Sequence, residues 1–456
     1  MTIELPLKGA LFTTGSIARH VLVMTMTGAV GMMALFMVDL ISLYFLARLK
    51  QTAVTAAMGY ASGVMFFALS TALGSGIAAT ALVARSIGAG DVKRARGYAT
   101  SSLLFSLLSS VVLAIILILF SDDLLSLMNA TGEARDLALA YIWIVSPGLI
   151  LFGVALCLSA ILRGLGDARR AMYVTLAMAL VNVGLDPVLI LGLDMGIQGA
   201  AVAAVVGYLA AVCIGLHSVV AIHGFLDTIR LASLRRDVLD IWTIAYPASL
   251  AQLSVPLGNA YVTYVIAWFG DEVVAGFAVI SRLMPVVFGI ALALAGAVGP
   301  IIGQNHGAGL HDRVRLALTQ SLAMSTVYTI AMSLALFMLS DQIANVFHAL
   351  GDAHDEIVFF CSFVSLSWAF IAAFFIANAA FNNLGYPKLS AIFSWARVTA
   401  GTIPFVHVGV ELGGWKGVLV GNALGAVIVA VLAVGVAYWI VSTDSVQSQH
   451  DLRESD

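Results

Sequence analysis

The stretch SIGAGDVKRAR (residues 86–96) has a second version, NHGAGLHDRVR, at residues 305–315. Two further pairs repeat at the same offset, the second with a slip of one residue: ILRGLGDARRAM (161–172) with AFNNLGYPKLSA (380–391), and MGIQGAAVAAVVG (195–207) with GGWKGVLVGNALG (413–425). A nearly fixed offset over most of a sequence indicates a chain built from two similar halves.

The composition places both halves in a membrane. Of the 456 residues, 61% are hydrophobic and 10% are charged, which no soluble globular protein of this length matches. The apolar runs are continuous rather than alternating, so they predict helices and not a barrel, and each crossing needs about 20 residues. Twelve spans are predicted, near residues 16–46, 52–80, 97–120, 136–161, 171–191, 199–222, 240–268, 273–299, 316–340, 356–381, 389–409 and 415–441.

The repeat and the spans together predict an all-α integral membrane protein with twelve transmembrane helices in two pseudo-symmetric six-helix bundles. Six is an even number, so both halves start on the same side of the membrane, and the axis that relates them runs along the membrane normal. The predicted parts are an N-terminal segment (1–15), an N-lobe (16–222), a linker (223–239), a C-lobe (240–441) and a tail (442–456). We expect the two lobes to enclose a central cavity.

The loops predict the orientation. Alternate loops carry most of the Lys and Arg, whereas the others carry only Arg48, Lys50, Arg135 and Lys416. By the positive-inside rule both termini are cytoplasmic, in a multi-pass protein of the cell (inner) membrane. A net charge of −3 argues against a nucleic-acid partner, and the three cysteines all fall within spans, so we expect neither disulfides nor a metal site. No nucleotide-binding motif, catalytic cluster or cofactor signature is found, which favours a transporter over an enzyme.

Four ionisable residues lie well inside predicted spans: Asp39, Asp186, Arg282 and Arg397. Such residues are rare in membranes and usually face the protein interior. The repeat counterparts of Asp39 and Asp186 are Gly258 and Phe405, so both acids belong to the first half alone. We interpret them as functional; the alternative is a structural acid satisfied by the backbone or by an arginine.

The sequence around Asp186 predicts an ion-coupling or protonation site. Asn182 lies four residues earlier, on the same helix face. Pro187 lacks an N–H, so the carbonyl of Val183 loses its helical partner. Acid, amide and freed carbonyl within one turn can hold a proton, a cation or water, and the proline loosens the helix where the acid works.

Further residues are candidates for lining a substrate pocket, although packing roles are at least as common for their types. Flexible thioethers suit an adaptable apolar cavity, aromatic rings attract cations, and neutral amides offer polarity without charge. An intramembrane arginine can contact an anionic group or pair with an acid. The candidates are Tyr141, Pro187, Met33, Gln252, Asn259, Arg282 and Asn378.

Five stretches, FMVDLISLYFLARL, VARSIGAGD, AILRGLGDARRAM, VNVGLDPVLILGLDMGIQGAAVAA and LGYPKLSA, resemble the multidrug and toxic compound extrusion (MATE) family. The resemblance implies a twelve-helix protein with two lobes that exports cationic or amphipathic compounds in exchange for protons or sodium. The family's span-1 acid falls on Asp39, its span-5 Asn and Asp fall on Asn182 and Asp186, and its span-4 Tyr falls on Tyr141. The NorM-like branch has acids in spans 7 and 10, where this chain has only the rim acid Glu356, so the chain looks DinF-like.

One departure from the family pattern bears on the coupling ion. Members with a cation site in the N-lobe often carry a Thr in span 6, where this chain has Ala204. The loss of that oxygen favours protons over sodium. The expected partners are small cationic or amphipathic substrates, protons and the lipid bilayer, and the expected state is a monomer. The alternatives are a sodium-coupled exporter, a flippase for lipid-linked precursors from the same superfamily, and a facilitator with no ion coupling.

Overall fold

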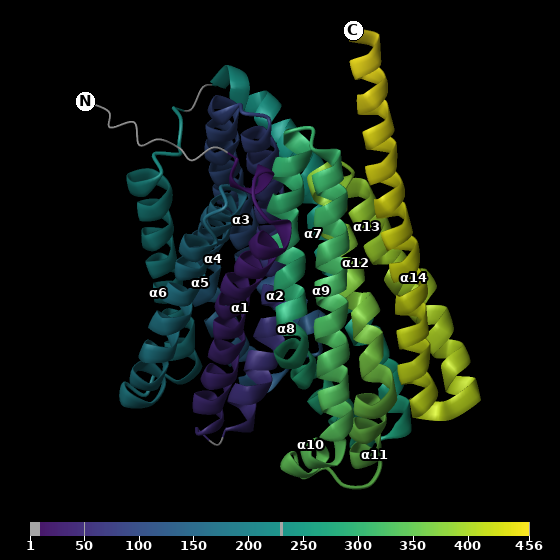
Figure 1. Cartoon of the computed structure of the whole chain (residues 1–456). Coiled ribbons are helices and arrows are strands. Elements are labelled where there is room, and N and C mark those ends of the chain that lie inside the picture. Colours follow the sequence, from purple (N-terminus) through teal and green to yellow (C-terminus); the bar gives the residue numbers. More distant parts are fainter. Residues whose placement is uncertain (1–9, 50, 229–230, 456) are drawn as a thin grey trace. The chain divides into compact units, whose positions relative to one another are not determined.

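The computed structural model describes residues 10–49, 51–228 and 231–455, and the regular structure in these ranges is helical throughout. Two compact units divide the chain. Unit 1 contains Val30–Ser249 together with the residues up to Leu11, and unit 2 contains Phe12–Ala29 and everything from Leu250 onward. Each unit is a bundle of long helices (Figure 1).

In unit 1, α4 packs against α2, α3 and α6, and α5 packs against α6. The elements of this part of the chain are α1 (Ile17–Ala47), α2 (Thr52–Gly88), α3 (Val92–Leu127), α4 (Gly132–Gly164), α5 (Ala168–Asp186), the π-helical segment η2 (Pro187–Gly192), α6 (Gly196–Leu216), η3 (His217–Ile222) and the first part of α7 (Leu231–Ile266).

In unit 2, α12 packs against α8, α9 and α14, and α11 packs against α8. Its elements, after the short η1 (Leu11–Thr13) and the first part of α1, are the remainder of α7, η4 (Ala267–Phe269), α8 (Asp271–Gly307), α9 (His311–Met338), α10 (Ser340–Val346), α11 (Gly351–Phe359), η5 (Phe360–Val364), η6 (Ser365–Ser367), α12 (Trp368–Leu384), α13 (Pro387–Ala396), η7 (Arg397–Thr402) and α14 (Ile403–Ser455).

The helices account for the predicted spans. Within the described ranges, ten helical stretches are long and apolar enough to cross a membrane. The last of these, Pro387–Thr443, is interrupted at Gly413 and Gly414, whose backbone angles are not helical, so it contains two passes. With α7, which has 36 residues but a polar beginning, the chain reaches the twelve spans expected from the sequence.

The repeat is visible in the ends of the helices. Helices α2 and α8 each have 37 residues, and their last residues, Gly88 and Gly307, are separated by the offset of the sequence repeat. The turns after α2 and α8 contain the left-handed glycines Gly90 and Gly309, which are separated by the same offset. The turns after α4 and α12 contain a second such pair, Gly166 and Gly385. Left-handed backbone is easily adopted only by glycine, which explains why these glycines recur.

The first helix of each half is divided between the units. Helix α1 passes from unit 2 to unit 1 at Ala29–Val30, and α7 passes from unit 1 to unit 2 at Ser249–Leu250, so the two crossing points nearly coincide under the repeat. The lobe limits predicted from the sequence, 16–222 and 240–441, follow the order of the spans and do not include this exchange of helix halves. They remain a prediction about the membrane topology.

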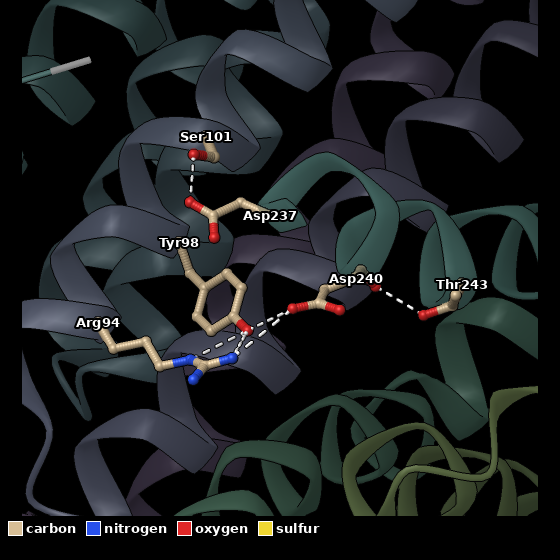
Figure 2. A network of polar contacts seen from close by, with 6 residues as sticks. All are labelled: Arg94, Tyr98, Ser101, Asp237, Asp240 and Thr243. Carbon is tan, nitrogen blue, oxygen red and sulfur yellow. Dashed lines mark hydrogen bonds and ion pairs between the residues drawn. The ribbon is translucent and has the colours of Figure 1, made fainter. Parts of the chain in front are cut away.

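Polar contacts hold the first part of α7 against α3 within unit 1 (Figure 2). The Tyr98 hydroxyl donates a hydrogen bond to Oδ2 of Asp240 at 2.6 Å, and Nη2 of Arg94 donates to the Tyr98 hydroxyl at 2.8 Å. The Ser101 hydroxyl donates to Oδ2 of Asp237 at 2.9 Å. The start of α7 is thus fastened at two carboxylates, about one turn apart.

Unit 2 holds the chain before α1 in a corresponding way. Nη2 of Arg313 donates to the carbonyl oxygen of Phe12 at 2.9 Å, and its Nε donates to Oδ1 of Asn305 at 3.0 Å. The Phe12 N–H donates to Oε1 of Gln304 at 3.0 Å. Arg94 and Arg313 are equivalent under the repeat, because each follows the last glycine of its G-A-G motif by the same distance. Each arginine therefore contacts the segment that begins the other half's first helix.

Small residues allow the last two spans of each half to approach closely. In unit 1, a Cβ on Gly207 of α6 would lie 2.9 Å from the carbonyl oxygen of Met178 on α5. In unit 2, Gly421 and Gly425 of α14 lie against the carbonyls of Phe405 and Gly401, with no room for a Cβ. Small residues let helix backbones touch in membranes, where burial of apolar surface provides no driving force between helices.

This packing predicts that Gly421→Ala destabilises unit 2. The added methyl would clash with the Phe405 carbonyl oxygen, and overpacking of this kind costs about 1–3 kcal/mol. Thermal unfolding of the purified protein in detergent measures the effect. Gly435→Ala is the matched control, because a Cβ there on the same helix would meet no atom within 4 Å. Equal melting temperatures for the two variants would contradict the close crossing.

Candidate ion-coupling site

Asp186 is fully buried at the end of α5. The Ser42 hydroxyl of α1 donates a hydrogen bond to its Oδ2. With the Asn182 amide oriented so that its nitrogen faces the acid, Nδ2 lies 3.1 and 3.2 Å from the two carboxyl oxygens. Asn182 and Asp186, which the helical spacing places on one face, lie beside each other in the structure. The donors that contact this carboxyl are neutral, and none of them cancels its charge.

The helix changes its geometry immediately after the acid. Asp186 is the last α-helical residue, and Pro187 begins the π-helical segment η2. The wider turn is seen in the hydrogen bond from the Leu193 N–H to the carbonyl of Val188 at 2.8 Å. A proline cannot supply the regular hydrogen bond, and short π-helical turns often occur at functional positions. The π-helical turn after Asp186 is the local change in the helix at Pro187.

Helix α6 lies directly against this part of α5. A Cβ on Gly207 would lie 3.7 Å from Cβ of Asn182, so the two backbones are close beside the amide that contacts Asp186. Ala204, where a Thr was expected for a sodium site, is buried one turn earlier on α6 and has no side-chain oxygen.

Asp39 lies on α1, but its side chain is outside the part of the chain that the structure describes. Ser42 follows it by three residues, a spacing that places both on one face of the helix. Ser42 is not among the residues predicted from the sequence, although its position about one turn from the intramembrane acid Asp39 is a signal that could identify it.

The other candidates lie in two different environments. In unit 1, Tyr141 is buried in an apolar cluster that also contains Ile190 of η2, and Met33 on α1 is half-buried. Tyr141 is therefore near the segment that follows Asp186.

In unit 2, the predicted residues are more scattered. Gln252 is half-buried, and Asn259 and Arg282 are exposed. Asn378 is buried, and its Nδ2 donates to the Ser394 hydroxyl at 3.1 Å, which links α12 to α13. Asn378 thus has a helix-packing role in addition to any contact with substrate.

Arg397 begins η7, inside a predicted span. Its guanidinium lies over the ring of Phe374, 5.5 Å from the centroid, and no described residue accepts a hydrogen bond from its buried Nε.

The helix that carries Asp186 is anchored at its other end by Asp167. This carboxyl accepts a hydrogen bond from the Arg170 N–H at 3.1 Å, which caps α5, and lies 2.9 Å from Nε2 of His223. Burial alone would raise the pKa of Asp167, but the hydrogen bonds from His223 and Arg170 outweigh it and lower this pKa to about 2.

Comparison with known proteins identifies the family. The family model MatE matches the chain twice, over residues 28–188 and 247–408, and the starts of the two matched stretches are separated by the repeat offset. The chain belongs to the MatE family. Members of this family are transporters, not enzymes, and the MATE family predicted from the sequence is confirmed.

Individual relatives extend over most of this MatE chain. A FAD transporter of Shewanella oneidensis is 28% identical over 421 residues, covering 88% of this chain and 90% of the relative. A probable multidrug resistance protein NorM of Thermotoga maritima is 22% identical and covers 79% and 80% of the two chains. A solved MOP superfamily transporter from Pyrococcus furiosus superposes with a TM-score of 0.90 at 23% identity, covering 96% and 98%. The predicted two-bundle, twelve-helix fold is thereby confirmed.

Replacing Pro187 with Ala restores a donor for the Val183 carbonyl, so the α-helix can continue past Asp186. We expect slower transport with unchanged or higher stability, because the turn beside the acid becomes stiffer. Transport rates and melting temperatures of the purified variant measure both effects. Pro147→Ala in α4 is the control, because it also repairs a helix of unit 1 but does not adjoin the acid. A Pro187→Ala protein that transports normally would show that the π-helical turn is incidental.

The lowered pKa of Asp167 predicts a stability change with pH. The ionised carboxylate stabilises the folded state by up to about 2 kcal/mol above its ordinary pKa of 3.8, and this contribution is lost as the pH falls through about 2. Asp167→Asn should therefore lower the melting temperature near neutral pH, and the gap to the wild type should close in acid. Asp91→Asn, which removes the cap of α3, is a control with a smaller expected effect. A gap that widens in acid would refute the assignment.

Proposed function

We propose that this MatE transporter is a proton-coupled antiporter that exports cationic or amphipathic organic compounds by alternating access, with both termini in the cytoplasm. The burial of the Asp186 carboxyl among neutral donors is the observation that supports the proposal most strongly. A carboxylate without a cationic partner is unfavourable inside a membrane protein, and a proton removes that charge.

In this mechanism Asp186 and Asp39 accept protons in one conformation and lose them in another. Ser42 and Asn182 donate hydrogen bonds that stabilise the charged form of Asp186, so the acid can also exist without its proton. The π-helical turn at Pro187 allows the segment after the acid to repack when the charge changes. A proton then drives export because it stabilises one conformation more than the other.

Sodium fits this group of residues less well. A bound cation needs several oxygen ligands, and Ala204 supplies none where related N-lobe sites often have a Thr. Protonation requires only the carboxyl itself. The proposed assignment to the DinF-like branch has a different basis: Asp39 and Asp186 belong to the first half, and predicted spans 7 and 10 carry no acid apart from Glu356.

A second candidate cargo is an organic anion of the dinucleotide class. The relative from Shewanella oneidensis is named a FAD transporter, and Arg397 offers a half-buried cation whose Nε has no partner among the described residues. The lipid-precursor flippase requires cationic side chains of the same kind. Export of FAD by proteoliposomes that ignore a cationic dye, with loss of that export in Arg397→Gln, would favour the anion and overturn the cationic cargo.

The decisive test of coupling is dye efflux from proteoliposomes with imposed ion gradients. We expect efflux to follow the pH gradient, to persist without sodium, and to be abolished in Asp39→Asn and Asp186→Asn at normal expression, since an amide cannot exchange a proton. Asp91→Asn, which makes the same change at an exposed acid that caps α3, serves as the control. Efflux that follows an inward sodium gradient when the pH gradient is clamped to zero would overturn proton coupling.

A further inference from the structure

Glu356 on α11 is a second fully buried acid, and it belongs to unit 2. Neither carboxyl oxygen makes a hydrogen bond of acceptable geometry with a described residue, although the Phe277 backbone lies close to the carboxyl. The carboxyl lies against α8, where a Cβ on Gly276 would be 2.5 Å from Oε2. Unlike Asp186, this acid receives no side-chain hydrogen bond from a described residue.

The repeat shows that the other half has no such group. Under the repeat offset, Glu356 corresponds to Leu137, and Gly276 corresponds to Ala57. Leu137 packs on the apolar cluster of unit 1 that contains the fully buried Ala57. Unit 2 thus replaces an apolar Ala–Leu pair with Gly and Glu, and the missing Cβ of Gly276 makes the room that the carboxyl occupies.

A pocket of about 270 Å³ adjoins this position. Its lining comes from the start of α8, the connection between α10 and α11, and α11 itself. Helices α10 and α11 lie at one end of unit 2 (Figure 1). Its walls include Gly276, Ala353 and Ile357, which are the neighbours of Glu356 on α8 and α11, and its polar lining consists of Glu272 and His348.

The other ionisable groups around α11 leave Glu356 without a counter-ion. Glu272 of α8 accepts a hydrogen bond from the Asp352 N–H at 3.3 Å. His354 lies 3.9 Å from Asp341 of α10. The basic groups near α11 are His354 and Lys416 of α14, whose Nζ lies 5.7 Å from the centroid of the Phe359 ring. The acidic neighbour Asp352 makes a negative charge at Glu356 less favourable.

We propose that Glu356 is a proton-binding site of unit 2, separate from Asp186 and reached through the pocket beside α8, α10 and α11. Burial of an unpaired carboxylate is far more costly than burial of the neutral acid, and a proton is the smallest species that neutralises it. No group of three or more His, Cys, Asp or Glu is arranged for a metal ion within the described ranges, which favours a proton over a divalent cation. The site does not depend on coupling at Asp186.

Infrared difference spectroscopy of the purified full-length protein tests this directly. We expect a protonated-carboxyl absorption at neutral pH that disappears on a jump to alkaline pH and is absent in Glu356→Gln, which also releases one proton fewer per molecule. Asp186→Asn should retain this absorption, so failure of the coupling proposal and failure of this one are distinguishable. An unchanged spectrum in Glu356→Gln, or an absorption abolished by sodium at constant pH, would overturn the proton site.

The repeat supplies the matched variant for a structural role. Gly276→Ala/Glu356→Leu restores the pair found in unit 1, so we expect it to fold with a melting temperature at least equal to that of the wild type and to lack the absorption. Gly276→Ala alone should lower the melting temperature, because its Cβ meets the carboxyl. A double variant that folds normally yet keeps the protonated-carboxyl absorption would assign that absorption to another acid and refute the proposal.

Discussion

A bilayer offers no hydrogen bonds to the groups buried in it, and most of this structure follows from that constraint. The backbone satisfies itself in helices, and the helices approach one another where Gly207 and Gly421 leave the carbonyls of neighbouring helices unobstructed. A buried acidic side chain can either receive hydrogen bonds that stabilise its charge or lose its charge by binding a proton. Asp186 has donors from Ser42 and Asn182, whereas Glu356 has none among the described residues and must be neutral or bind a cation. The difference in donors separates an acid that can stay ionised from one that holds its proton.

The repeated arginines show how the two halves are connected. Arg94 holds the start of α7 through Tyr98 and Asp240, and Arg313 holds the chain before α1 through backbone carbonyls. The equivalent arginines therefore both hold the segment that begins the other half's first helix, although the atoms that accept their hydrogen bonds differ. The first part of α7 belongs to unit 1, and the first part of α1 belongs to unit 2. A unit that moves therefore moves the first part of the other half's first helix with it. If the proposed alternating access operates, α1 and α7 are the helices in which one unit continues into the other, at Ala29–Val30 and Ser249–Leu250.

The sequence predicted the spans, the repeat and the pairing of Asn182 with Asp186, because hydropathy, offset and helical periodicity are local signals. It did not predict Ser42 as the donor to Asp186, since that contact joins residues 144 positions apart. The position of Glu356 near the end of a predicted span predicts an acid at the rim, which is wrong: α11 packs on α8, and Glu356 is fully buried. The exchange of helix halves between the units also left no sequence signal, because hydropathy is insensitive to which neighbour a helix packs against.

A difference between the halves is informative only when it is combined with burial. Asp91 and Asp167 cap α3 and α5, while their counterparts Leu310 and Tyr386 begin α9 and α13 without a side-chain cap. Like Asp186, these acids have no acidic counterpart in the other half. They lie at helix starts and stabilise a turn, so this difference between the halves is explained without a role in transport. At Asp186 and Glu356 the asymmetry occurs at full burial, where a charged group is costly and an apolar residue in the other half shows that the fold does not require it. An acid that is both fully buried and replaced by an apolar residue in the other half is therefore a candidate for a chemical role, whereas either property alone does not identify one.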